Sequence, residues 1–204
     1  MVLDVKRLTV QDKKLSRDTT TKLRYITGRG GFSESGLNKY LRTFSDDFKV
    51  LANDRNLHRR SVNEQIEIVR EFSNEATHLI ANSYGAYLWL LSRIDATESA
   101  ARVLLLSPLM GRHTDQSNMM GSRPPRLKGL ESAIESGKIV LPEVISVYTG
   151  QADPVCDYRT AIDVCAKLKI TDLHILSKQN HLLDHQIVGQ VIEAFLNRAL
   201  ATHQ

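Results

Sequence analysis

The chain has 204 residues, of which 42% are hydrophobic and 25% are charged, and its formal net charge is +4. This length suits one substantial core and is short for two ordinary domains, so we expect a single domain over residues 1–204. The basic residues are scattered and lack the concentrated face with stacking aromatic residues that nucleic-acid binding favours, so we expect no nucleic-acid partner. No apolar run approaches the ~20 residues that a membrane-spanning helix needs.

The N-terminus and the cysteines indicate a reducing compartment. An acid lies among the first seven residues and no long apolar stretch follows them, which is unlike a secretory signal. Cys156 and Cys165 have neither Cys-x-x-Cys spacing nor a histidine at zinc-finger spacing, so we interpret them as reduced structural thiols. We therefore expect a cytoplasmic protein with no bound metal and no cofactor. The sequence indicates no oligomeric state.

Strand-like and helix-like segments alternate from about residue 23 to the end of the chain. Short apolar strands are predicted at residues 23–27, 48–52, 79–82, 103–106, 144–148 and 173–176. Helical spacing of apolar residues predicts helices at residues 37–44, 62–72, 84–93, 158–168 and 186–200. This alternation predicts an α/β fold, with a mostly parallel central sheet of about six strands and helices on both of its faces.

Two segments depart from this pattern. Residues 1–20 are ambiguous, and the alternatives are an edge strand at residues 8–10 or a loose arm. Residues 107–142 contain several glycines and prolines around one weak helix near residues 130–135. We interpret this second segment as a short cap-like insertion that flanks a site, and we expect it to form a modest flap.

Ser83 lies where an apolar strand turns sharply into a helix. A serine in such a strained turn needs small residues two positions before and after it, and Ala81 and Gly85 meet this requirement. The common form of the turn is Gly-x-Ser-x-Gly, from which the alanine departs by one methyl group. This arrangement is typical of a catalytic nucleophile. The alternative is a structural helix cap, in which Ser83 or Asn82 satisfies the free N–H groups of the helix start.

An acid and a histidine follow two later strands. The strand at residues 144–148 leads to Asp153, and the strand at residues 173–176 leads to His181. Parallel α/β sheets gather their functional groups at the carboxyl ends of the strands, so we expect both side chains to lie near Ser83.

Three other residues are weaker candidates for the same roles. Asp157 lies farther from its strand end than Asp153, and His185 lies beyond His181 in or near the last helix. His174 alternates inside a strand, so we interpret it as structural.

The chain order of Ser83, Asp153 and His181, each after its own strand, resembles that of the α/β-hydrolases over roughly residues 23–200. The resemblance implies a three-layer α/β-hydrolase-like fold and a serine hydrolase of the esterase type with a minimal cap. It implies that His181 removes the Ser83 proton as the hydroxyl attacks an acyl carbon, and that Asp153 orients His181. The substrate would be a small-molecule carboxylic ester or thioester, with small amides as the alternative, cleaved through an acyl-enzyme.

The resemblance also implies two backbone donors for the oxyanion of the tetrahedral intermediate. One is the N–H of Tyr84, directly after the nucleophile. The other comes from the glycine-rich loop after the first strand, from the N–H of Arg29 with Gly30 as the alternative. Each such donor contributes roughly 3–4 kcal/mol of transition-state stabilisation. In many relatives a histidine begins this loop, whereas Thr27 stands there in this chain.

Two other functions remain as alternatives. Residues 28–33 resemble the Gly-x-Gly-x-x-Gly turn of dinucleotide-binding proteins, with Ser33 in place of the third glycine, and Asp54 lies near the expected place of a ribose-binding acid. That interpretation leaves Ser83, Asp153 and His181 unexplained. The second alternative is an α/β-hydrolase-fold module that binds without turnover.

Overall fold

The computed structural model describes residues 21–99, 101–112 and 124–197, and the edge strand considered at residues 8–10 lies outside these ranges. Six strands form one all-parallel sheet in the order β2-β1-β3-β4-β5-β6 within the described residues. The strands are β1 (Lys22–Ile26), β2 (Asp47–Leu51), β3 (His78–Asn82), β4 (Arg102–Leu106), β5 (Ile145–Gly150) and β6 (Asp172–Leu176). Each of the six predicted strands is confirmed within two residues at its ends.

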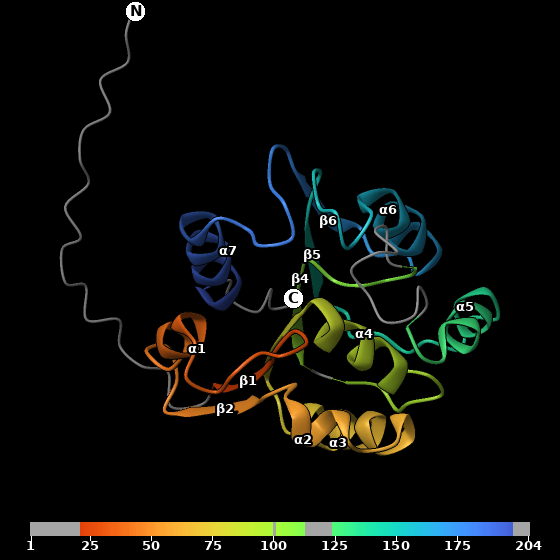
Figure 1. Ribbon diagram of the computed structural model, residues 1–204, viewed down its shortest axis with the longest axis horizontal. Coiled ribbons are helices and arrows are strands. Elements are labelled where there is room, and N and C mark those ends of the chain that lie inside the picture. The colour runs from red at the N-terminus through yellow and green to blue at the C-terminus, as the bar shows by residue number, and fades with distance from the viewer. Residues whose placement is uncertain (1–20, 100, 113–123, 198–204) are drawn as a thin grey trace, which may run out of the picture.

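Helices cover both faces of this sheet. Figure 1 shows α1 and α7 on one face and the remaining helices on the other. The helices of the described ranges are α1 (Gly36–Leu41), α2 (Arg55–His58), α3 (Val62–Asn74), α4 (Ser83–Ser92), α5 (Leu127–Glu135), α6 (Tyr158–Lys167) and α7 (His185–Asn197). The predicted three-layer α/β architecture is therefore confirmed. None of these helices is both long and apolar enough to cross a bilayer.

The burial of each element follows from its sequence. β4 is fully buried along its length, as its apolar run predicts for a central strand. α4 is buried on all sides after Ser83, because it lies against the sheet with α3 packed beside it. α3 is amphipathic, and its start is fixed by a capping box in which Ser61 accepts from the Glu64 N–H and Glu64 accepts from the Ser61 N–H. The short α2 was not predicted.

The strand order creates a crevice at the carboxyl edge of the sheet. β1 pairs with β2 on one side and with β3 on the other, so the chain leaves β1 in one direction and returns on its far side at β3. Ligands in open α/β sheets bind at such a switch point, outside the carboxyl ends of the strands. The loop after β1 and the start of α4 meet here.

Within residues 107–142, the described part packs beside the central helices. α5 contacts α6, and the Tyr87 hydroxyl of α4 donates to the Pro125 carbonyl at 2.7 Å. An isolated antiparallel bridge joins Ile94 to Ile139. The middle of this segment, residues 113–123, lies outside the described residues, so the expected flap stays a prediction.

Candidate active site

The turn between β3 and α4 holds Ser83 in a left-handed backbone conformation. Its φ is 51°, a region that costs an L-residue about 1–2 kcal/mol. Gly85 lies against the end of β1, because a Cβ there would be 2.3 Å from the Thr27 carbonyl oxygen. Gly28 approaches from the next loop, where a Cβ would be 3.2 Å from the Ser83 Cβ. The surrounding backbone therefore holds the serine in a strained turn of the kind that exposes a nucleophile.

Ser83, His181 and Asp153 form a continuous row of hydrogen bonds. Ser83 Oγ lies 2.9 Å from His181 Nε2, and His181 Nδ1 lies 2.8 Å from Asp153 Oδ2. The three side chains come from the ends of β3, β6 and β5, so the structure brings together the residues that the chain order singled out. With the proton on Nδ1, His181 Nε2 accepts from the serine hydroxyl, which is the arrangement of a general base.

The Asp153 carboxylate is held by its own turn. Its side chain is fully buried, and Oδ1 accepts from the backbone N–H groups of Val155 at 2.7 Å and Cys156 at 2.9 Å. Burying a carboxylate is costly unless it is hydrogen-bonded, and these donors satisfy Oδ1. Oδ2 is thereby left facing His181, so the turn orients the acid toward the histidine.

The loop that carries His181 rests directly on the end of β5. A Cβ at Gly150 would be 2.4 Å from the Gln179 carbonyl oxygen and 2.6 Å from that of Asn180. The same Gln179 carbonyl accepts from the Ala152 N–H at 2.9 Å. The acid loop and the histidine loop are thus in backbone contact, and only a glycine permits this approach. Sequence reasoning missed Gly150, although a glycine at a strand end can signal a close backbone approach.

Two backbone N–H groups beside Ser83 have no acceptor in the described residues. Tyr84 lies in the first turn of α4, where backbone donors lack intrahelical partners, and the N-cap residue Asn82 makes no side-chain cap hydrogen bond. The Arg29 N–H likewise has no backbone acceptor. In contrast, the Gly30 N–H donates to the Asn53 carbonyl at 2.8 Å. The Gly30 N–H is therefore already engaged in this conformation, which favours Arg29 over Gly30 as the candidate donor.

Thr27 fixes the glycine-rich loop through Asn53. The Asn53 N–H donates to Thr27 Oγ1 at 2.8 Å, and Thr27 Oγ1 lies 3.2 Å from the Gly28 carbonyl, to which it donates. Together with the Gly30 bond to Asn53, these contacts join the loop to the end of β2. The threonine that replaces the expected histidine thus has a definite role in holding the loop, and Asn53 is a supporting residue that sequence reasoning missed.

Positive charge lies beside this loop. Burial lowers the pKa of His58 and the nearby Arg29 guanidinium lowers it further. Burial raises the pKa of the Tyr84 phenol, and Arg29 partly offsets that increase. The Arg29 side chain is exposed, and no acidic side chain of the described residues pairs with it. Negative charge that develops next to Tyr84 and Arg29 would therefore meet a favourable field.

The weaker candidates have other roles or other places. Asp157 caps α6 by accepting from the Arg159 N–H at 3.0 Å, and His185 begins α7. His174 Nε2 lies 2.7 Å from Asp172 Oδ1, at a distance typical of a structural pair.

The residues that resemble a dinucleotide site have other structural roles. Asp54 caps α2 by accepting from the N–H groups of Asn56 at 2.8 Å and Leu57 at 3.2 Å. The glycine-rich loop packs on Ser83, and α1 begins only at Gly36. A dinucleotide-binding turn leads directly into a helix, whereas this loop does not.

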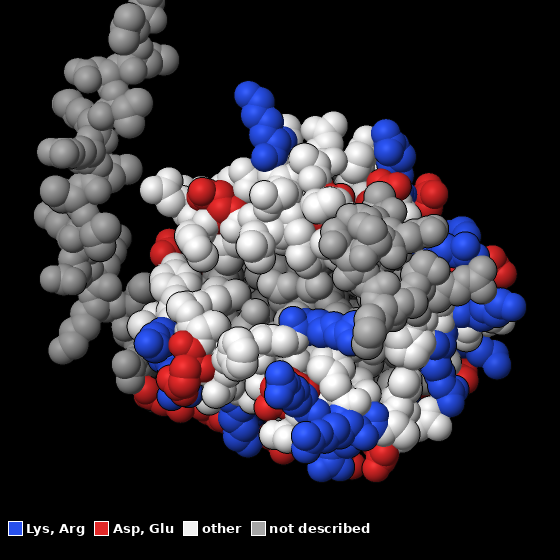
Figure 2. All heavy atoms as spheres, viewed as in Figure 1, with Lys and Arg blue, Asp and Glu red and all other residues white. Residues whose placement is uncertain are grey.

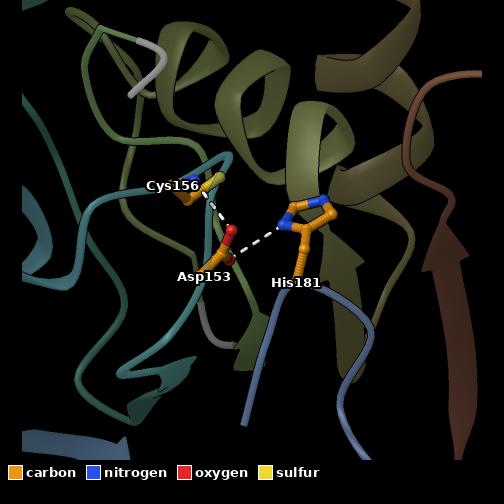
Figure 3. Close-up of side chains that lie close together, drawn as sticks. All are labelled: Asp153, Cys156 and His181. Atoms are coloured by element: carbon orange, nitrogen blue, oxygen red, sulfur yellow. Dashed lines mark hydrogen bonds and ion pairs between the residues drawn. The ribbon is translucent and has the colours of Figure 1, made fainter. Parts of the chain in front are cut away.

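Asp153, Cys156 and His181 form a cluster of metal-ligand residue types. One potential ligand atom from each lies within 4.8 Å of the others, and Figure 3 shows Cys156 on one side of the carboxylate and His181 on the other. Burial, and to a smaller extent the Asp153 carboxylate, raise the pKa of the Cys156 thiol well above its ordinary value. A protonated thiol and a carboxylate occupied by N–H donors are poor metal ligands, so the cluster fits a hydrogen-bonded acid and base.

A cavity of about 1260 Å³ begins at Ser83 and extends between α1 and α7. Ser83, His181 and the glycine-rich loop line it, together with Leu109 and Val155. The inner faces of the two helices form the walls, with Leu37 and Val188 among the lining residues. In Figure 2 residues other than Lys, Arg, Asp and Glu cover most of the surface over α7, charged side chains of both signs lie over α1, and basic side chains gather over α2 and α3. The candidate catalytic residues thus open into a largely apolar space.

No family model and no curated protein matches the sequence. Solved structures resemble its fold. A monoacylglycerol lipase from Paleococcus ferrophilus has a TM-score of 0.64 and 15% identity, over 89% of this chain and 97% of its own. The esterase PE8 has a TM-score of 0.58 and 18% identity, over 89% and 94%. Est1E from Butyrivibrio proteoclasticus has a TM-score of 0.58 and 14% identity, over 89% and 88%. Together with the sheet order and the helical layers, this likeness establishes that the chain has the α/β-hydrolase fold.

Proposed function

We propose that this protein is a serine hydrolase that cleaves a carboxylic ester or thioester through a Ser83, His181 and Asp153 triad. The observation that carries the proposal is the unbroken row from Ser83 Oγ to Asp153, with links of 2.9 and 2.8 Å, ending at a serine in a strained turn. The solved structures that resemble the fold include a lipase and esterases, which favours ester chemistry.

Acylation begins at the serine hydroxyl, which is a poor nucleophile near neutral pH. His181 Nε2 accepts its proton as Oγ attacks the carbonyl carbon of the substrate, and the same proton passes to the leaving alcohol or thiol. Asp153 holds the Nδ1 proton of His181 and stabilises the imidazolium that forms. Its buried, fully hydrogen-bonded carboxylate keeps the ring in one orientation, so little reorganisation is needed during the reaction.

The oxyanion of the tetrahedral intermediate is bound by the N–H groups of Tyr84 and Arg29. The Tyr84 N–H lies in the first turn of α4, where the helix dipole favours negative charge, and the Arg29 guanidinium adds positive charge near Tyr84. Water then attacks the acyl-enzyme with His181 as the base, which releases the acid and restores the hydroxyl. The contacts between Thr27 and Asn53 support binding of the oxyanion, because they hold the loop that carries Arg29.

A fluorophosphonate probe tests the nucleophile directly, since it phosphonylates only an activated serine. Wild type should be labelled and should hydrolyse p-nitrophenyl acetate, and Ser83→Ala should lose both properties. The matched control is Ser107→Ala, since Ser107 is a buried serine that lines the same cavity and its hydroxyl makes no hydrogen bond within the described residues. If the folded wild type resists labelling, a non-catalytic binding module is favoured. If labelling is lost in Ser107→Ala but kept in Ser83→Ala, the assignment of Ser83 as the nucleophile is wrong.

A further inference from the structure

The cavity that begins at Ser83 is larger than a short ester requires. Pockets for drug-sized ligands measure about 300–1,000 Å³, and this cavity measures about 1260 Å³. An acetyl or propionyl ester bound at the triad would occupy a small part of it. The remaining space continues away from Ser83 along the inner faces of α1 and α7, over the ends of Tyr25 and Leu106.

The walls of this continuation, here named the α1–α7 groove, are apolar. Leu37 and Tyr40 line it from α1, and Leu183 and Val188 line it from α7 and the residues just before that helix. Besides His181, the ionisable residues that could carry charge in the cavity lining are Arg29 in the loop beside the triad and Asp184 and His185 at the start of α7. A surface of this composition binds hydrocarbon and offers few partners to a sugar or a peptide.

A hydrogen bond joins the two walls. The Tyr40 hydroxyl of α1 donates to Glu193 Oε1 of α7 at 2.9 Å. Glu193 lies one helical turn beyond Gly189, which also lines the cavity. The contact between Tyr40 and Glu193 therefore marks where the two helices meet along the groove.

Gly189 keeps the groove open beside Tyr40. It lies inside α7, where glycine destabilises a helix relative to alanine. A Cβ at this position would be 3.5 Å from the Tyr40 hydroxyl oxygen, in ordinary contact, and its φ is not in the left-handed region. The backbone therefore does not require glycine here. The missing side chain leaves room in front of Tyr40, which a longer residue would fill.

We propose that the α1–α7 groove binds the hydrocarbon chain of a medium- or long-chain ester, and that Gly189 sets the length of chain that fits. This inference rests on the proposed ester hydrolysis at Ser83. Each methylene buried in the groove would improve kcat/KM roughly threefold to fourfold. The chain belongs to either the acyl or the alcohol part of the ester, and both place the same hydrocarbon in the groove.

The test measures kcat/KM for two series of soluble esters, with chains of two to ten carbons. One series varies the acyl group of p-nitrophenyl esters, and the other varies the alcohol of n-alkyl acetates. In at least one series, wild type should prefer the eight-carbon chain over the two-carbon chain by at least tenfold. Gly189→Leu should lose at least tenfold on the eight-carbon ester and less than threefold on the two-carbon ester.

A control glycine separates filling of the groove from a general effect on helices. Gly129 lies in α5, and a Cβ there has open space around it, so Gly129→Leu should keep the wild-type chain-length profile. Gly36→Leu fills the opposite wall from α1, where a Cβ also meets no atom of the other described residues within 4 Å, its own helix backbone aside. Gly36→Leu replaces Gly189→Leu in the test if thermal melts show that Gly189→Leu does not fold.

The outcomes distinguish this inference from the proposed function. If acetate hydrolysis depends on Ser83 but both series are flat, or if Gly189→Leu lowers all chain lengths equally, the groove assignment is wrong and the hydrolase assignment stands. Isothermal titration of Ser83→Ala with octanoate and 1-octanol provides a readout without turnover. At least one of the two ligands should bind to Ser83→Ala, and it should bind at least tenfold more weakly to the double variant that also carries Gly189→Leu. If neither ligand binds, the inference is overturned, even when no ester is cleaved.

Discussion

Gly150→Ala is the sharpest test of how the triad is held together. The added methyl would meet three backbone atoms of the histidine loop, with the Gln179 carbonyl oxygen at 2.4 Å. Ordinary contact begins at 3.4 Å, so the loop must move by about 1 Å. A misplacement of that size in a catalytic group can lower the rate about 100-fold. His181 belongs to this loop, so its 2.9 Å link to Ser83 Oγ would lengthen.

The expected result is therefore a loss of about 100-fold in kcat for p-nitrophenyl acetate, with a parallel decrease in the rate of fluorophosphonate labelling. Overpacking of this kind also costs about 1–3 kcal/mol of folding free energy, which urea denaturation would measure. Gly129→Ala is the control, since it adds the same methyl where, apart from its own helix backbone, no atom of the described residues lies within 4 Å. If Gly150→Ala keeps activity within threefold of wild type, the close approach of the two loops does not control the triad geometry.

Asp153→Asn should keep the turn, since an amide oxygen can still accept from the N–H groups of Val155 and Cys156. Its kcat should fall roughly 10⁴-fold, because the imidazolium loses its charged partner. Activity within tenfold of wild type would contradict the triad. Thr27→Val leaves the buried Asn53 N–H without its acceptor, so it should lower the free energy of unfolding by about 1–3 kcal/mol in urea denaturation and should also lower kcat. Its control, Ser61→Ala, removes only the cap of α3 and should lower the free energy of unfolding by about 1 kcal/mol with activity retained. Burial raises the pKa of the Cys165 thiol to about 12 from its ordinary 9.0. Above pH 9 the unfolded chain has lost this proton while the folded chain keeps it, so stability should fall as pH rises from about 9 toward 12, and this slope should decrease in Cys165→Ala. An unchanged slope in that variant would show that the thiol is not the group responsible.

The sequence predicted the elements that carry strong local patterns. The apolar run of β4 and the serine turn after β3 were both readable, because burial on two faces and a strained junction each restrict residue types locally. The order of Ser83, Asp153 and His181 placed the three side chains at one edge of a parallel sheet. Their meeting in the structure follows from that topology.

The contacts between loops could not be predicted in the same way. Asn53 and Gly150 act through backbone atoms of segments far away in the sequence, so no local spacing marks them. α2 has four residues, fewer than two turns, and so shows no helical period. Gly189 lies inside the helix predicted at residues 186–200, and its place beside Tyr40 depends on how α1 and α7 pack.

The same contacts explain why an alanine is tolerated at position 81 and why a glycine is needed at position 85. Ala81 lies inside the sheet, in register with Ile26 and Leu105 at ordinary strand spacing, and its methyl is fully buried there. Gly85 instead faces the Thr27 carbonyl, where a Cβ would be 2.3 Å away. The two small positions around Ser83 therefore meet different constraints. The first has room for a methyl group, whereas the second holds α4 against the loop that carries Arg29, so the departure from Gly-x-Ser-x-Gly leaves the geometry of the turn intact.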